Sequence, residues 1–220
     1  MLIDIIIKAF STYASFLPFL LGLVTWRRNA RSVRFLVLLS VVACTTEMIS
    51  ALLAYQRIPI LFLFHFYPPV ELVFILVIYG IELRESISGW VFRAIGICFV
   101  GYSILNTILW QPLQVFNTNG RGVESLLLVI LSVIYTTLQL KRDHGLKSGE
   151  AMFWVNTAVL LYFSLNLVFF FMSNYLNEHF SQQFTSYIWN FHAGLSFVRY
   201  LFFTIAIYID WKSNRSPVLS

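Results

Sequence analysis

Residues 60–83 read ILFLFHFYPPVELVFILVIYGIEL, a stretch that is apolar over almost its whole length. A helix needs roughly 20 such residues, at a rise of about 1.5 Å each, to cross the hydrocarbon core of a bilayer. The run LVFILVIYG at 72–80 is apolar on every side, whereas the strands of a membrane β-barrel alternate polar and apolar residues. The stretch therefore predicts a transmembrane α-helix.

Six further stretches have the same length and character. Together they give seven predicted spans, at 5–24, 32–55, 60–83, 90–110, 123–140, 151–172 and 186–209. Charged residues make up only 11% of the chain, which is too few for the surface of a soluble domain, where about a quarter is usual. We therefore predict an all-α fold, with residues 1–220 forming a single seven-helix transmembrane domain. The first span is interpreted as a retained helix, because Asp4 precedes it and TWRRNAR follows it, unlike a signal peptide.

Lys and Arg residues are distributed unevenly between the two sides of this predicted bundle, and cytoplasmic segments carry the excess in membrane proteins. One side holds eleven of them: Arg27, Arg28, Arg31, Arg34, Arg84, Arg93, Lys141, Arg142, Lys147, Lys212 and Arg215. The other side holds Lys8, Arg57 and Arg121. The sequence thus predicts an N-terminus outside and a cytoplasmic C-terminus, in a multi-pass protein of the plasma (inner) membrane.

Polar side chains inside the spans are costly in lipid and mark candidate sites. The ligand-cavity candidates, most of them in the predicted outer half, are Glu47, His65, Glu71, Asn106, Asn166, Asn190 and His192. We expect Glu47, His65 and His192 to line one cavity that is reached from outside. Glu71 and Arg199 lie at similar depths in the third and seventh spans, which favours a buried ion pair between them. That pair either fixes the register of the helices or takes part in a ligand site or switch.

Pro68 and Pro69 stand in the middle of the third span. Neither has an N–H group, so the carbonyls of Phe64 and His65 lose their usual helical donors. Free carbonyls next to polar residues are typical of the broken-helix sites of transporters. Membrane helices also tolerate prolines as simple kinks, and both interpretations are open at this point.

The motifs of several chemistries are missing. There is no HExxH and no histidine pair at i, i+4, so we predict no metal site; if a metal were bound, its ligands would be His65, His192 and Glu47. We predict no cofactor, and retinal is excluded because the seventh span has no lysine for a Schiff base. The net charge of +5 is interpreted as a topology signal, since nucleic-acid binding needs a basic face on a soluble module. No catalytic residues are assigned.

The last two spans contain FWVNTAVLLYFSLN and WNFHAGLSFVR. These segments resemble the sixth and seventh helices of an uncharacterised family of seven-helix integral membrane proteins from Bacteroidetes-type bacteria. The matching residues are Phe153, Trp154, Tyr162, Phe163, Ser164, Asn166, Trp189, His192 and Arg199, with Glu71 matching a glutamate of the third helix. Leu165 departs from the family, which often has Gly there. The resemblance implies no established reaction, but genes of the family often lie beside sensor-kinase genes, which suggests signalling.

Three functions fit these observations. The favoured one is a receptor-like membrane sensor with an outward-facing polar cavity, which signals through a separate cytoplasmic protein docked on the basic loops. The second is a membrane-embedded enzyme for a lipid or isoprenoid, with Glu47, His65, Glu71 and His192 as acid–base or metal-binding groups. The third is a small-solute carrier that uses the proline-containing third span. In each case the lipid bilayer is the expected surrounding.

Overall fold

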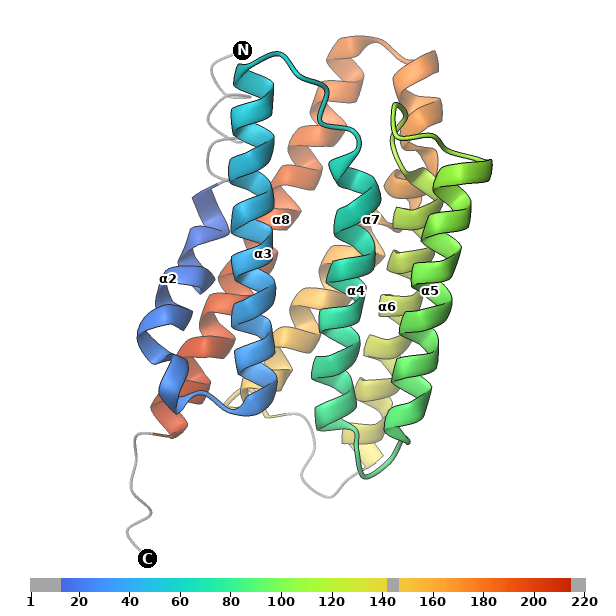
Figure 1. Cartoon of the computed structure of the whole chain (residues 1–220). Coiled ribbons are helices and arrows are strands. Elements are labelled where there is room, and N and C mark those ends of the chain that lie inside the picture. The colour runs from blue at the N-terminus through green and yellow to red at the C-terminus, as the bar shows by residue number, and fades with distance from the viewer. Residues whose placement is uncertain (1–12, 142–146, 215–220) are drawn as a thin grey trace, which may run out of the picture.

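The computed structural model describes residues 13–141 and 147–214, and every regular element in those ranges is helical. The elements are α2 (Phe16–Thr25), the 3₁₀ helix η1 (Trp26–Arg28), α3 (Arg31–Tyr55), α4 (Leu63–Glu82), α5 (Gly89–Leu109), α6 (Thr118–Lys141), α7 (Ala151–His179) and α8 (Gln182–Ser213). Helices α3 to α8 run alternately up and down as an antiparallel bundle (Figure 1). These six are long and apolar enough to cross a membrane, by length and composition.

The predicted spans correspond to these helices with several shifted boundaries. Part of the first predicted span, 5–24, lies outside the described residues, and α2 is its described remainder. Helix α6 begins five residues before the predicted start at 123. Helices α7 and α8 extend through most of the predicted 6–7 loop, so that only Phe180 and Ser181 separate them. Ser181 is the N-cap of α8: its hydroxyl accepts a hydrogen bond from Phe184 N at 3.3 Å. Helix α8 can therefore begin directly after the short turn.

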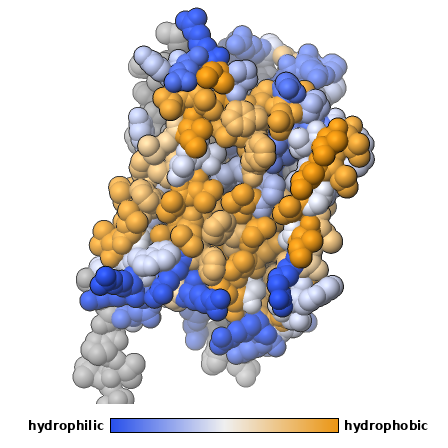
Figure 2. All heavy atoms as spheres, viewed as in Figure 1, coloured by the Kyte–Doolittle hydropathy of each residue, from blue (hydrophilic) through white to orange (hydrophobic). Residues whose placement is uncertain are grey.

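The two ends of the bundle differ in charge. We call the end that carries the α2–α3 and α4–α5 connections the basic end; it holds Arg27, Arg28, Arg31, Arg34, Arg84, Arg93, Lys141, Lys147 and Lys212. It lies at the bottom of Figure 1. The α3–α4, α5–α6 and α7–α8 connections form the opposite end. On the face shown in Figure 2, hydrophobic side chains fill the middle and hydrophilic ones gather toward both ends, as expected for a chain that spans a bilayer.

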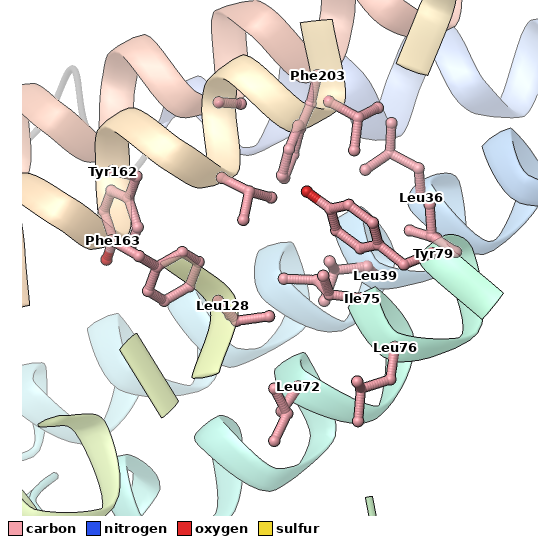
Figure 3. Packing of buried hydrophobic residues seen from close by; sticks show 14 of the residues in the cluster. Leu36, Leu39, Leu72, Ile75, Leu76, Tyr79, Leu128, Tyr162, Phe163 and Phe203 are labelled. Carbon is pink, nitrogen blue, oxygen red and sulfur yellow. The ribbon is translucent and has the colours of Figure 1, made fainter. Parts of the chain in front are cut away.

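Helix α4 packs against three other helices, α3, α5 and α6. Its apolar half buries Leu72, Ile75 and Tyr79, which face Phe203 and other side chains of the core (Figure 3). The Tyr79 hydroxyl donates a hydrogen bond to Asn156 Oδ1 at 2.7 Å, and Ser132 Oγ donates to the same oxygen at 2.8 Å, so these buried polar groups satisfy one another. The core thus fixes how α4 is rotated relative to α7 and α8.

Helix α4 continues through Pro68 and Pro69, so the hypothesis of a broken helix is wrong at this position. Only five residues of α4 precede Pro68, and its first turn is closed by bonds such as His65 N to Phe62 O at 3.0 Å. The carbonyl of Phe64, which Pro68 deprives of its helical donor, accepts a hydrogen bond from Asn117 Nδ2 at 3.1 Å. A side chain from another segment therefore replaces the missing backbone N–H.

Candidate functional site

Two glutamates and two arginines form a buried chain of ion pairs inside the bundle. Glu71 on α4 contacts both arginines: Arg199 Nη1 lies 2.6 Å from its Oε1 and Arg121 Nη1 lies 2.7 Å from its Oε2. Arg121 Nη1 also lies 2.8 Å from Glu124 Oε2. None of the four residues is more than 6% exposed. Along the chain Arg199–Glu71–Arg121–Glu124 the positive and negative groups alternate, with two of each. The contacts link α8, α4 and α6.

Aromatic side chains surround this charge network, by which we mean Glu71, Arg121, Glu124 and Arg199. The Tyr67 hydroxyl donates a hydrogen bond to Glu71 Oε1 at 3.1 Å. The guanidinium carbon of Arg199 lies 4.0 Å from the centre of the Tyr162 ring, a cation–π distance. Tyr162 belongs to α7, so the network reaches a fourth helix.

Arg121, which the sequence predicts to lie outside the spans with Lys8 and Arg57, is instead buried within α6. Because α6 begins at Thr118, Arg121 lies within the helix and shares a face with Glu124 three residues later. In the sequence, the three-residue spacing of these two opposite charges, directly before an apolar run, is the signal that indicates a helix already formed at Arg121. With Arg121 buried, the imbalance of exposed Lys and Arg between the two ends becomes larger.

A cavity of about 100 Å³ adjoins the charge network. Its walls come from α3, α4, α6, α7 and α8, and its polar lining comprises Thr46, Glu47, Ser50, Tyr67, Arg121, Tyr162, His192, Ser196, Arg199 and Tyr200. One water takes up about 30 Å³ in the liquid, so the cavity has room for roughly three waters or one molecule of a few heavy atoms. Thus the structure brings Glu47 and His192 to one cavity with the Glu71–Arg199 pair at its edge.

The environment of His192 fixes which of its nitrogens carries the proton. Asn166 Nδ2 donates to the carbonyl of Tyr162 at 2.7 Å, which orients the amide so that its Oδ1 faces His192 Nδ1 at 2.9 Å. An amide oxygen only accepts, so Nδ1 is the donor, and the neutral ring keeps an unshared electron pair on Nε2. The rings of Tyr162, Phe169, Phe170 and Trp189 surround the imidazole, with centroids 5.3–5.8 Å away.

Glu47 supplies a further carboxylate to the cavity. It is half-buried, and no hydrogen bond or ion pair engages it within the described ranges. Arg199 and Arg121 are the charged groups that act on it electrostatically. When Glu47, Glu71 and Glu124 are all ionised, three carboxylates face two guanidinium groups, and the cavity and the network together carry one net negative charge.

Three predicted candidates lie elsewhere. His65 points away from the cavity: its Nδ1 lies 3.0 Å from Thr107 Oγ1 and its Nε2 lies 3.0 Å from the carbonyl of Val115, so its ring packs against α5 and the α5–α6 connection. The prediction that His65 shares a cavity with Glu47 and His192 is therefore wrong. Asn190 is buried on α8, but it is not among the residues that line the cavity.

Asn106, the third of these candidates, belongs to a group of amide side chains that closes the opposite end. Its Nδ2 donates to Asn117 Oδ1 at 2.9 Å, and its Oδ1 accepts from Asn119 Nδ2 at 3.0 Å. Asn117 Oδ1 also accepts from Gly120 N at 2.9 Å, which is the hydrogen bond of a helix N-cap. Asn117, which the sequence analysis did not single out, therefore caps α6 and satisfies the freed carbonyl of α4.

The three residues named as ligands in case a metal is bound, His65, His192 and Glu47, do not converge, because His65 faces α5. Over residues 13–141 and 147–214, no group of three His, Cys, Asp or Glu side chains is placed to hold a metal ion.

No known family model, curated protein or solved structure matches this chain.

Proposed function

We propose that this protein is a receptor-like membrane sensor, in which the cavity at Glu47 and His192 binds a small cation. The observation that carries the proposal is the position of this cavity directly beside a charge network that joins α4, α6 and α8. A ligand that changes the field at Arg199 or Arg121 acts on three helices at once, because buried ion pairs cost several kcal/mol to leave unbalanced, about 3–5 kcal/mol in soluble proteins.

The lining favours a cation of a few heavy atoms. Glu47 and His192 both line the cavity; the Glu47 carboxylate and the unshared pair on His192 Nε2 can both accept hydrogen bonds. Arg121 and Arg199 also line it, and their charges are offset by Glu71 and Glu124. The volume of about 100 Å³ suits an ammonium-sized ion and is too small for an isoprenoid or a lipid chain. These features support the sensor more than the enzyme, whose proposed group His65 also lies outside the cavity.

The proposed orientation places the basic end in the cytoplasm and the cavity in the half of the membrane nearer the exterior. Two features at the basic end suit a separate signalling partner. The first is the set of exposed arginines, including Arg27, Arg28 and Arg84. The second is a cavity of about 250 Å³ between the ends of α3, α4, α7 and α8, whose lining includes Glu82, Glu150 and Asp210. The resemblance to a family linked with sensor kinases supports the same assignment.

The test is the thermal stability of purified protein, at fixed pH and ionic strength, in titrations with ammonium, methylammonium and guanidinium chloride. We expect at least one of these ions to raise the Tm of the wild type, because a ligand that binds only the folded state stabilises it. The Glu47→Gln and His192→Ala variants should lose that increase.

The matched controls are Glu178→Gln and His179→Ala, which change exposed residues at the α7–α8 turn. They should respond to the cations as the wild type does. Equal responses of wild type and cavity variants, or no response to any of the three ions, would contradict the proposal.

A further inference from the structure

An apolar groove of about 650 Å³ lies between α4 and α5 and ends at the basic end of the bundle. The two helices are neighbours in Figure 1. Its walls include Val73, Val77 and Ile81 on α4 and Ile97 and Val100 on α5. This surface faces away from the core, since Ile97 is 75% exposed. The groove is therefore open to whatever surrounds the bundle.

Glycines make the groove deep. A Cβ atom built on Gly80 would lie 3.3 Å from the Phe92 ring, so α4 and α5 approach each other closely there. A Cβ atom built on Gly96 would meet Leu76 at an ordinary 3.6 Å and Val73 at 3.8 Å, so the first atom of a side chain is accommodated there and further atoms extend among the residues that line the groove. Gly96 is thus a place where the groove can be filled by substitution.

Two arginines stand at the mouth of the groove. Arg31 begins α3 and Arg93 is the fifth residue of α5, and both are exposed. Arg93 Nε donates to the carbonyl of Gly89 at 3.3 Å, which leaves both of its terminal nitrogens for another partner. Neither arginine makes an ion pair with any residue of the described ranges. Trp90, 68% exposed beside Arg93, marks the level of the membrane interface.

The groove has a continuation. A second apolar groove of about 550 Å³, toward the opposite end, shares Val73 and Val100 with the first. The two together form one apolar track along α4 and α5, with cationic side chains at one end only. An apolar track with two exposed arginines at one end matches a molecule with a hydrocarbon chain and an anionic head.

We propose that this groove binds one anionic phospholipid, with an acyl chain along α4 and α5 and the phosphate between Arg31 and Arg93. The proposal requires insertion into a membrane but does not depend on the function of the cavity. Guanidinium groups hold phosphate oxygens through paired hydrogen bonds. Basic pockets between membrane helices select anionic head groups in this way. A zwitterionic lipid offers the same chain without the net negative charge, so the arginines should discriminate between the two.

The experiment is native mass spectrometry of delipidated protein, titrated separately with dioleoylphosphatidylglycerol and dioleoylphosphatidylcholine. We expect the wild type to bind the anionic lipid more tightly. An arginine near the membrane surface contributes about fivefold to such binding, so Arg31→Gln with Arg93→Gln should weaken it about 25-fold. The affinity for the zwitterionic lipid should stay unchanged, and Gly96→Leu should weaken binding of both lipids.

Arg84→Gln is the matched control, because Arg84 is an exposed arginine at the same end that does not line the groove. It should keep the preference of the wild type. Equal affinity of the wild type for the two lipids would overturn the proposal, and so would an equal loss of preference in Arg84→Gln. A wild-type dimer that Gly96→Leu converts to a monomer would instead assign the groove to a second copy of this chain.

Discussion

Glu71→Gln removes the one carboxylate that contacts both arginines of the charge network. Arg121 then keeps Glu124 at 2.8 Å, but Arg199 keeps no carboxylate; it keeps the hydroxyl of Tyr200 at 3.2 Å and the Tyr162 ring at 4.0 Å. The network changes from two positive and two negative groups to two positive and one negative. Arg199 becomes a buried cation without a counter-ion, 4% exposed.

Removing one partner of a buried ion pair costs about 3–5 kcal/mol. A loss of 1 kcal/mol lowers the Tm of a chain of this size by about 2–4 °C, so we expect Glu71→Gln to lower it by about 6–20 °C. Arg199→Leu should cost less, because Glu71 keeps Arg121 at 2.7 Å. The double variant leaves the neutral pair Arg121–Glu124 and should be more stable than Glu71→Gln alone.

The assay is unfolding of the purified variants in one detergent, followed by tryptophan fluorescence. The two single effects should together exceed the double effect by about 1–3 kcal/mol, which is the coupling expected for residues in direct contact. Glu178→Gln, the exposed control, should change stability by no more than about 0.5 kcal/mol. Additive single effects would refute the reasoning, because they would mean that Glu71 and Arg199 do not interact.

Two further predictions concern helix packing and topology. A Cβ atom on Gly22 would lie 2.5 Å from both methyl groups of Val37, so Gly22→Ala should push α2 away from α3 and lower the free energy of unfolding by about 1–3 kcal/mol. Gly101 is the control, because a Cβ atom there would have nothing within 4 Å. Gly101→Ala should be neutral or stabilising in the same unfolding assay. In a background without the native cysteines, Cys at Ser148 and Cys at Asn177 should react with a membrane-impermeant maleimide from opposite sides of the membrane; reaction of both from outside would contradict the proposed orientation.

The sequence was sufficient to predict the six long apolar helices α3 to α8, because an apolar run of roughly 20 residues leaves few alternatives in lipid. It also predicted which charges lie at one depth. Counting the rise per residue along the third and seventh spans placed Glu71 level with Arg199, and the structure brings the two side chains into contact. Depth follows from counting residues, so it can be read from a single chain.

The rotation of each helix about its axis could not be read in the same way. Helices that are apolar on every side give no pattern that distinguishes the core face from the lipid face. His65 and Glu71 are both polar residues of α4, yet one faces α5 and the other faces α6 and α8. Packing of the whole bundle decides this, and it involves residues far apart in the chain.

The start of α6 was the other failure. It depends on Asn117, whose side chain caps α6 while it bonds Asn106 and the carbonyl of Phe64, fifty-three residues away. A cap that is held by distant partners is invisible to local rules of helix initiation. The boundary was therefore placed too late, and Arg121 was assigned to the surface instead of to the charge network.

If the protein is a sensor, a cation in the cavity at Glu47 and His192 changes the arrangement of helices at the basic end. Electron–electron double resonance between spin labels at positions 84 and 148 measures that arrangement directly. With the cation that stabilises the wild type, we predict a shifted distance distribution, and no shift in His192→Ala. A distribution that stays the same while the cation demonstrably binds would contradict the sensor and leave the cavity as a binding site without an output.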